Sequence, residues 1–191
     1  MALKDTLATT FNPLFIVGIP TLFKVLQPFS SAPEVRFDTL LKPDVHIPIL
    51  LVAFTLASST LAHTTNRQFV DSCVHAQNNS IVGMLTFATV GCILLMYLFS
   101  TNIATTRRWL GSYALLCLFN AAWNYFAVDR ATRRPHVLFN LVTGVLLLTL
   151  VSVPVIAPRQ LWTYYLIFAG LGVAKTIQRG CPRTFICDSA T

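Results

Sequence analysis

The sequence predicts an all-helical (all-α) integral membrane protein, a polytopic bundle of six transmembrane helices. Of its 191 residues, 54% are hydrophobic and only 11% are charged, whereas a soluble domain carries about a quarter charged residues. The apolar residues gather in runs of about 20, which is the length that a helix needs to cross a bilayer. Six such runs occupy most of the chain, so we expect a single membrane domain over residues 1–191.

The first three predicted spans differ in how clearly they are bounded. Residues 11–26 contain Pro13 and Pro20 and end near Lys24. This stretch can alternatively lie as a kinked helix on the membrane surface, which would leave five spans. Residues 47–63 form a short apolar run after a polar loop, and residues 81–103 form the longest run. We expect both of these to cross the membrane.

The last three predicted spans follow one another closely. Residues 109–128 come after a tight turn, and residues 137–156 are the most apolar run. Residues 161–177 open with Trp162, Tyr164 and Tyr165, and such aromatic residues gather at the membrane–water interface. We therefore expect an aromatic belt where the last span enters the membrane.

Small residues mark the predicted contacts between helices, because helices in lipid approach each other where side chains are small. The expected close-approach points are Ala53, Ala57, Ser58, Gly83, Gly91, Gly170 and Gly172.

The formal net charge of +7 lies in short loops beside the apolar runs rather than in one patch. With six spans, one side of the membrane holds eight cations (Lys4, Arg67, Arg130, Arg133, Arg134, Lys175, Arg179 and Arg183) and the other holds five (Arg36, Lys42, Arg107, Arg108 and Arg159). The larger number predicts that both termini are cytosolic; with five spans the two sides would be equal. The expected partner is the lipid bilayer and not nucleic acid, because nucleic-acid surfaces combine basic and aromatic residues on a soluble scaffold.

The cysteines and motifs give no sign of a metal or a nucleotide. Cys92 and Cys117 lie within spans and are expected to pack as small apolar residues. Cys181 and Cys187 are close enough in the sequence to form a disulfide, and no histidine or further cysteine stands at metal-ligand spacing. Motifs of zinc proteases, serine hydrolases and phosphate-binding loops are absent, so we expect no metal and no cofactor.

His63, Arg67, Asp71 and His75 stand at intervals of four residues after the second span. If the helix continues past the membrane surface, they lie on one side of it, and Asp71 can pair with Arg67 one turn away. A histidine in such a polar pocket can act as an acid or base near neutral pH, which makes His63 a candidate catalytic residue. A solvated helix with an ordinary ion pair explains the same pattern.

Amides and aromatic side chains gather at the end of the fourth span. Asn120 and Asn124 are one helical turn apart, Trp123 and Tyr125 flank them, and Asn140 follows in the next span. Amides inside a bilayer must find partners, because hydrocarbon offers none. They either hydrogen-bond between helices or bind a polar group of a substrate. These five residues are therefore the predicted substrate-binding residues.

Asp129 ends the fourth span beside Arg130 and four residues before Arg133. A salt bridge at the level of the lipid headgroups would explain it. A partly desolvated carboxyl group would instead hold a proton and donate it to a substrate. Asp129 is therefore the second candidate catalytic residue.

The segment Asn120-x-x-Trp123 is similar to the N-x-x-W-E pattern of small integral-membrane terpene cyclases from fungal meroterpenoid pathways. The resemblance implies a lipophilic substrate and a role for the acidic residue after the tryptophan in protonating it. In this chain that position is Asn124, so the resemblance supplies no acid. It covers only a few residues.

Three functions are consistent with these features. The first is a small membrane enzyme of a biosynthetic pathway that cyclises or isomerises a lipophilic terpenoid-like or polyketide-like molecule. Proton transfer needs only a donor, a base and a cavity. The second is a non-catalytic accessory subunit of a membrane complex, with other membrane proteins as partners. The third is a small transporter or channel component, to which interrupted helices are suited.

Overall fold

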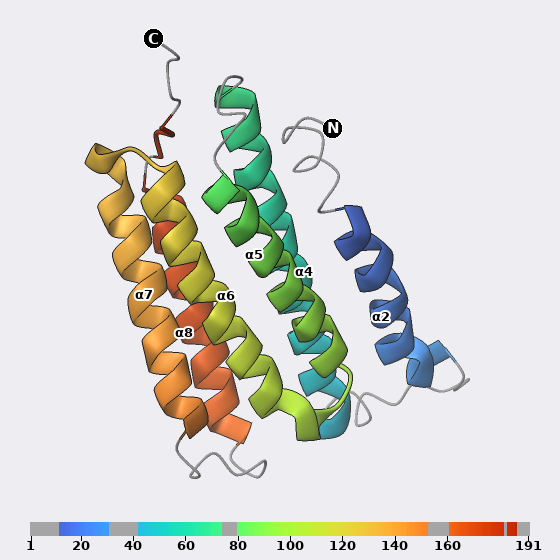
Figure 1. The fold of residues 1–191 in the computed structure, drawn as a ribbon. Coiled ribbons are helices and arrows are strands. Elements are labelled where there is room, and N and C mark those ends of the chain that lie inside the picture. Colours follow the sequence, from blue (N-terminus) through green and yellow to red (C-terminus); the bar gives the residue numbers. More distant parts are fainter. Residues whose placement is uncertain (1–11, 31–41, 74–79, 153–160, 182, 187–191) are drawn as a thin grey trace.

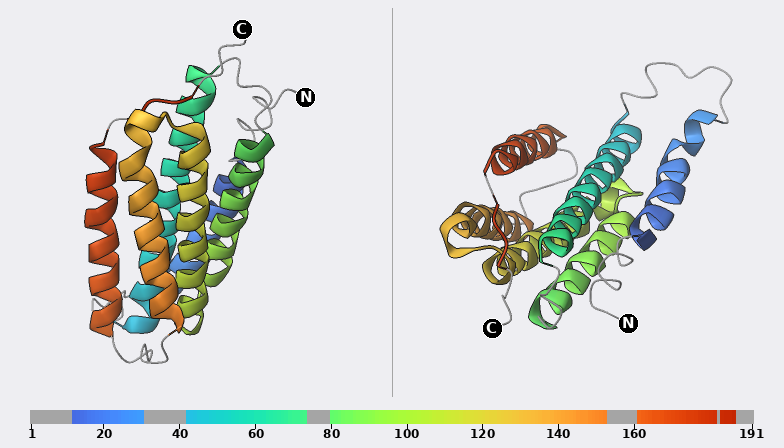
Figure 2. Two further views of the ribbon diagram at one scale, coloured as in Figure 1. Left: turned by 60° about the vertical axis from the view of Figure 1, so that its left-hand side comes forward. Right: turned by 90° about the horizontal axis from the view of Figure 1, so that it is seen from above.

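Six long helices run alternately up and down through one bundle in the part of the chain that the structure describes. The structure, a computed structural model, describes residues 12–30, 42–73, 80–152, 161–181 and 183–186. Its elements are α2 (Asn12–Ser30), α4 (Pro43–Ser72), α5 (Ser80–Phe99), the short 3₁₀ helix η1 (Ile103–Thr105), α6 (Thr106–Ala127), α7 (Arg130–Ser152) and α8 (Leu161–Arg179). Figure 1 shows α4 to α8 as the body of the bundle, with α2 beside α4 and α5. α7 and α8 lie on the opposite side from α2 (Figure 2).

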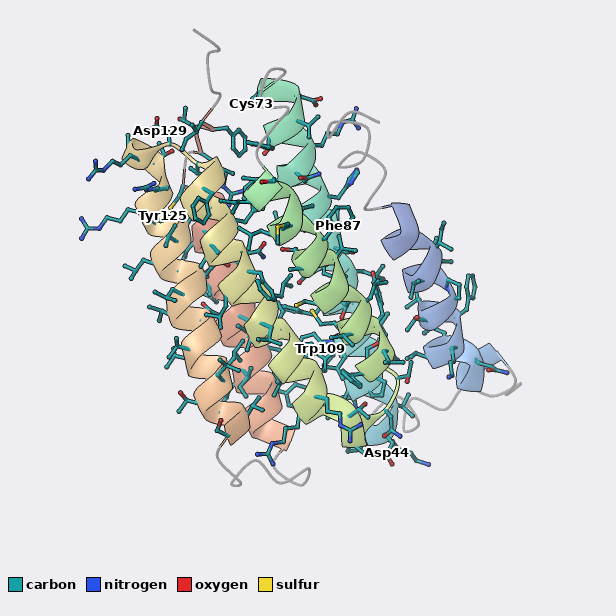
Figure 3. The ribbon with its side chains drawn as sticks, in the orientation of Figure 1. Asp44, Cys73, Phe87, Trp109, Tyr125 and Asp129 are labelled. Atoms are coloured by element: carbon teal, nitrogen blue, oxygen red, sulfur yellow. The ribbon has the colours of Figure 1, made fainter. Side chains whose placement is uncertain are left out.

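The alternation of helix directions brings the helix termini together at two ends. Figure 3 shows Cys73, which follows α4, and Asp129, between α6 and α7, at one end of the bundle. Asp44, at the start of α4, lies at the other. We call these the Asp129 end and the Asp44 end. α4, α6 and α8 finish at the Asp129 end, where α5 and α7 begin.

The helices confirm the all-helical fold class, and three of those described are long and apolar enough to cross a membrane. These are α4, α5 and α7, while α2 and α8 contain the shorter apolar stretches Ile16–Gln27 and Tyr165–Gln178. α4 has 30 residues, and at 1.5 Å per residue it measures about 45 Å. That length exceeds the roughly 30 Å of a bilayer core.

α4 therefore continues well beyond the predicted span 47–63. The Arg67–Asp71 ion pair is confirmed, with 3.7 Å between Nε and Oδ2 and both side chains exposed. Outside the described residues lie His75, residue 11 of the first predicted span, residues 153–156 of the fifth, and the side chains of Trp162 and Tyr164.

The bundle buries polar groups among its apolar core residues and exposes large apolar side chains on its outside. Each helix from α4 to α8 buries hydroxyl, amide or imidazole groups, among them Thr55, Ser59, Asn66, Thr86, Thr89, Ser112, Asn124, His136, Asn140 and Gln178. Large apolar side chains are instead exposed along the helices, and on α7 they are Leu138, Leu141, Val142, Val145 and Leu146. Soluble proteins rarely expose apolar patches of this extent, so the distribution fits a membrane protein.

α5 ends at Phe99 rather than at residue 103 as the sequence predicts. Asn102 has an extended backbone, and its side-chain oxygen accepts a hydrogen bond from the Ala104 amide (2.9 Å). The Thr105 hydroxyl donates to the Phe99 carbonyl (2.6 Å), which satisfies a group that the end of a helix leaves without an internal partner. Local hydrogen bonds thus stop this helix inside an apolar run.

α7 begins at Arg130 rather than at residue 137, because Asp129 caps it. The Oδ1 atom of Asp129 accepts a hydrogen bond from the Ala131 amide (2.8 Å), as side chains at helix N-termini commonly do. The stretch after Asp129 that the sequence leaves between two predicted spans is therefore already helical.

An aromatic cluster closes the interior toward the Asp44 end. Trp109 is fully buried and stacks on Tyr113, with 5.5 Å between ring centroids. Its ring also meets those of Phe54 and Phe168, at 5.9 and 5.6 Å. The indole Nε1 donates to the Thr55 hydroxyl (2.9 Å). Side chains of α4, α6 and α8 are thereby joined around one ring.

α6 and α7 are in close contact at Gly144. A Cβ atom there would lie 2.8 Å from Cδ2 of Leu118 and 3.1 Å from the backbone oxygen of Ala114. Gly91, Gly170 and Gly172 have nothing within 4 Å of such an atom. The prediction of close approach is therefore wrong for these three glycines.

We expect Gly144→Ala to lower the free energy of unfolding by about 1–3 kcal/mol, the usual effect of overpacking, because the backbone oxygen of Ala114 cannot turn away. Gly91→Ala is the matched control. It stands in open space within a helix and should raise stability by up to about 1 kcal/mol through helix propensity. SDS titration of the detergent-solubilised protein, followed by circular dichroism, measures both. Equal effects of the two changes would contradict close packing at Gly144.

Candidate ligand-binding cavity

A polar cavity lies between α4, α5, α6, α7 and α8, on the Asp129 side of the aromatic cluster. Its volume is about 60 Å³, which is room for about two water molecules at roughly 30 Å³ each. Its lining residues are Ser58, Leu61, Ala62, Thr65, Asn66, Thr86, Thr89, Tyr113, Leu116, Asn120, Trp123, Asn124, Asn140, Lys175, Gln178 and Arg183. Five helices and the segment after α8 thus supply side chains to one interior site.

Two buried asparagines each bring an unpaired oxygen to this cavity. The side-chain NH₂ of Asn124 donates to the Asn120 carbonyl (2.5 Å), and that of Asn140 donates to the His136 carbonyl (2.8 Å). Since a carbonyl only accepts, these bonds fix which side of each amide carries the NH₂ group. Neither Oδ1 atom has a partner within the described residues, and the two residues are only 4% and 2% exposed.

An unpaired buried acceptor destabilises a protein by about 1–3 kcal/mol, and such groups are few in native structures. A ligand with two hydrogen-bond donors, such as two hydroxyl groups, would satisfy both asparagine oxygens. The cavity is therefore suited to a polar group that the protein does not itself provide.

Arg183 closes the cavity toward the Asp129 end. Its guanidinium donates to the Thr65 hydroxyl (3.0 Å) and contacts His136 Nδ1 (3.1 Å). Thr65 stands seven residues before the end of α4 at Ser72, and His136 six residues after the start of α7 at Arg130. At 1.5 Å per residue, the guanidinium reaches roughly 10 Å below these helix ends.

The Arg183 guanidinium is partly buried and remains a cation. Burial lowers its pKa, but an arginine stays protonated in proteins and can only donate hydrogen bonds. His136 must therefore accept at Nδ1, which makes it a neutral imidazole with its proton on Nε2. The Nε atom of Arg183 has no partner within the described residues.

Residues 183–186 form a strap across the Asp129 end that holds Arg183 in place. The Thr184 carbonyl accepts a hydrogen bond from the Asp129 amide (2.7 Å). The ring of Phe185 packs edge-on against Phe69 of α4, with centroids 5.6 Å apart. The strap is thus fixed to α4 and to the connection between α6 and α7.

The cysteines at this end differ from the sequence prediction. Cys181 is free, so the predicted Cys181–Cys187 disulfide is wrong. Cys73 is disulfide-bonded instead, and its Sγ lies 3.5 Å from the backbone oxygen of Ile186 in the strap. Cys187 lies outside the described residues.

A larger groove adjoins the cavity. It has a volume of about 730 Å³, within the range of about 300–1,000 Å³ that is typical of small-molecule sites. The two spaces share Leu61, Thr65, Gln178 and Arg183, and His136 lines the groove. The groove and the cavity therefore meet at Arg183.

Four of the five predicted substrate-binding residues line the cavity: Asn120, Trp123, Asn124 and Asn140. The indole Nε1 of Trp123 donates to the Thr86 hydroxyl (3.1 Å), which fixes the ring in the wall. The fifth residue, Tyr125, is 49% exposed, and the Arg133 guanidinium lies 4.3 Å from its ring centroid. The structure does not bring Tyr125 to the cavity.

The two predicted catalytic residues line neither the cavity nor the groove. Asp129 is at the N-terminus of α7, where its carboxylate caps the helix. His63 is half-buried on α4. The structure thus separates these two titratable groups from the predicted substrate-binding residues.

Sequence reasoning missed the cavity residues of α4, α8 and the strap, chiefly Asn66, Lys175, Gln178 and Arg183. The sequence places Lys175 and Arg183 among the cations on one side of the membrane, whereas both line the cavity. The Lys175 ammonium donates to Gln178 (3.3 Å). The spacing of Lys175 and Gln178 could have indicated these two residues, because polar residues three positions apart on an apolar helix lie on the same side of it.

The described residues contain no group of three or more histidine, cysteine, aspartate or glutamate side chains that could hold a metal ion. Comparison with known protein families, curated proteins and solved structures finds no match for this chain.

Proposed function

We propose that this chain is a small multi-pass membrane enzyme that binds the polar end of a lipophilic molecule in the cavity. It isomerises or cyclises that molecule by proton transfer. The observation that carries the proposal is the pair of buried, unpaired oxygens of Asn124 and Asn140 in one cavity. They are acceptors for which a ligand is the natural donor.

The apolar outer surface supports a lipophilic ligand that arrives from the membrane. We propose that all six helices cross the bilayer, since α2, α6 and α8 alternate in direction with the three helices that are long and apolar enough to do so. The aromatic cluster around Trp109 closes the interior toward the Asp44 end. This favours a one-ended binding site over a channel.

His136 is the titratable group that we propose for proton transfer. It is 1% exposed and lies where the groove meets the cavity, in contact with Arg183. Its Nδ1 lone pair accepts from the Arg183 guanidinium in the resting site. When that contact opens, Nδ1 takes up a proton from the ligand, and the imidazolium returns it to another carbon of the ligand. Asp129 and His63 would reach a ligand in the cavity only by a rearrangement of the bundle.

Two features bear on the orientation in the membrane, and they disagree. The cation count of eight against five predicts that the Asp129 end is cytosolic, together with both termini. The disulfide-bonded Cys73 lies at the same end, and structural disulfides are rare in the reducing cytosol. Because the difference of three cations is small, we propose that the Asp129 end faces an oxidising compartment.

The enzyme proposal is tested by deuterium transfer. Membranes from cells that produce the chain are incubated in D₂O, and their lipophilic extracts are compared by mass spectrometry. We expect a molecule that gains a carbon-bound deuterium only when the chain is present. Asn124→Ala and Asn140→Ala should each slow this labelling by up to about tenfold, because each removes a hydrogen bond worth about 0.5–1.5 kcal/mol.

Tyr125→Ala is the control for that experiment, since it changes an aromatic residue of the same helix that lies outside the cavity. It should leave the labelling rate unchanged. Labelling that is independent of the chain, or unaltered by both asparagine changes, would remove the support for an enzyme at this site.

A further inference from the structure

We infer that the polar end of the ligand carries a negative charge, a carboxylate-type or phosphate-type oxyanion held by Arg183. The inference rests on the proposed function, because it describes the ligand of the same cavity. The ligand is then an amphiphile with an anionic head.

The charges around the site are of one sign. Among the described residues, those that line the cavity and the groove include the cations Lys175 and Arg183 and no aspartate or glutamate. Carboxylates at the same end of the bundle are engaged elsewhere, since Asp71 pairs with Arg67 on the surface and Asp129 caps α7. A space whose charged side chains are all cationic attracts anions.

Arg183 is the group that would bind the oxyanion. Its guanidinium contacts the neutral Thr65 hydroxyl and the neutral His136 imidazole. Within the described residues no carboxylate lies in ion-pair distance of it, and its Nε has no partner. Burying an uncompensated charge is unfavourable, and guanidinium groups match carboxylate and phosphate oxygens in geometry.

The positions along α7 separate two groups that the ligand would meet. His136 contacts Arg183, and Asn140 stands four residues deeper on the same helix. Four residues rise about 6 Å. Arg183 and the Asn140 oxygen therefore lie at different depths in the site, so a hydroxylated lipophilic acid or phosphate would meet both groups.

The test measures binding to the full chain in phosphatidylcholine nanodiscs by tryptophan fluorescence, because Trp123 lines the cavity. The probes are dodecanoate, dodecyl phosphate and dodecanol, which share one alkyl chain and differ in the head. We expect at least one anion to bind about tenfold more tightly than dodecanol, and the two anions separate a carboxylate site from a phosphate site. Equal affinity of dodecanol and both anions, or no binding of any probe, overturns the inference.

Arg183→Gln should lower the affinity of the preferred anion about tenfold and leave dodecanol binding unchanged. Arg130→Gln, at an exposed cation of the same end, is the matched control and should change neither. An anion preference that survives Arg183→Gln overturns the inference. The wild-type ratio of anion to dodecanol affinity remains decisive if this variant does not fold.

Failure of the charge inference and failure of the proposed function give different results. If all three probes bind equally and deuterium transfer is still observed, only the inference of an anionic ligand is contradicted. If an anion is preferred and no deuterium transfer is observed, the enzyme proposal is contradicted and the chain is a binding protein.

Discussion

Replacing Trp109 by alanine is expected to lower the free energy of unfolding by about 3–5 kcal/mol, the largest effect of any single change considered in this chain. The indole is fully buried and stacks on Tyr113. It also makes edge contacts with Phe54 of α4 and Phe168 of α8. Its removal leaves a cavity between three helices and takes away the donor to the Thr55 hydroxyl oxygen, although that hydroxyl still donates to the Leu51 carbonyl (2.7 Å). SDS titration in detergent measures the change.

Phe126→Ala is the matched control for Trp109→Ala, since it removes an aromatic ring of the same helix that is 40% exposed. It should change stability by less than about 0.5 kcal/mol, as surface substitutions usually do. Trp109→Phe keeps a ring and removes only the hydrogen bond to Thr55, so a loss of about 0.5–1.5 kcal/mol is expected for the bond. If Trp109→Ala were no worse than Phe126→Ala, the cluster would not hold the Asp44 half together.

The helices could be predicted because hydropathy alone marks long apolar runs, and each of the six predicted runs overlaps a helix of the structure. Their ends could not be predicted from hydropathy. Asn102 and Asp129 set two of them through hydrogen bonds to backbone amides two residues away. The side chain of Asp129 was predicted as an acid, whereas an aspartate before a helix is also a cap. The same side chain is therefore compatible with a structural role at the start of a helix and with a catalytic role.

The α6 and α7 side of the cavity could be predicted, because amides within apolar runs must turn inward. Asn120, Asn124 and Asn140 follow that rule. Arg183 could not be predicted, since it comes after the last helix and nothing in the sequence shows that the chain folds back. The close-contact glycine was missed for a related reason. Gly144 and Gly91 look alike in the sequence, and only the packing of α6 against α7 separates them.

The strap that carries Arg183 is joined to the bundle by hydrogen bonds and ring contacts. Its backbone is joined to the bundle by hydrogen bonds such as that from the Ile186 amide to the Ala127 carbonyl (2.9 Å). Cys73 is buried beside Ile186 and is disulfide-bonded. A covalent bond at this place limits the freedom of the unfolded chain and so stabilises the fold. It is also the feature that argues for an oxidising compartment.

In sealed microsomes, whose outer surface is cytosolic, we expect Cys73 to stay oxidised in the presence of a membrane-impermeant phosphine. It should become reduced only after permeabilisation. Reduction should then lower the free energy of unfolding by about 2–4 kcal/mol, the usual contribution of a disulfide.

A polyethylene-glycol maleimide gel shift in a Cys181→Ser background reports the thiol, and Cys73→Ser is the control whose stability no longer responds to the phosphine. Reduction in sealed vesicles would place the Asp129 end in the cytosol, as the cation count predicts. Alkylation of Cys73 without any reductant would show that the disulfide is absent.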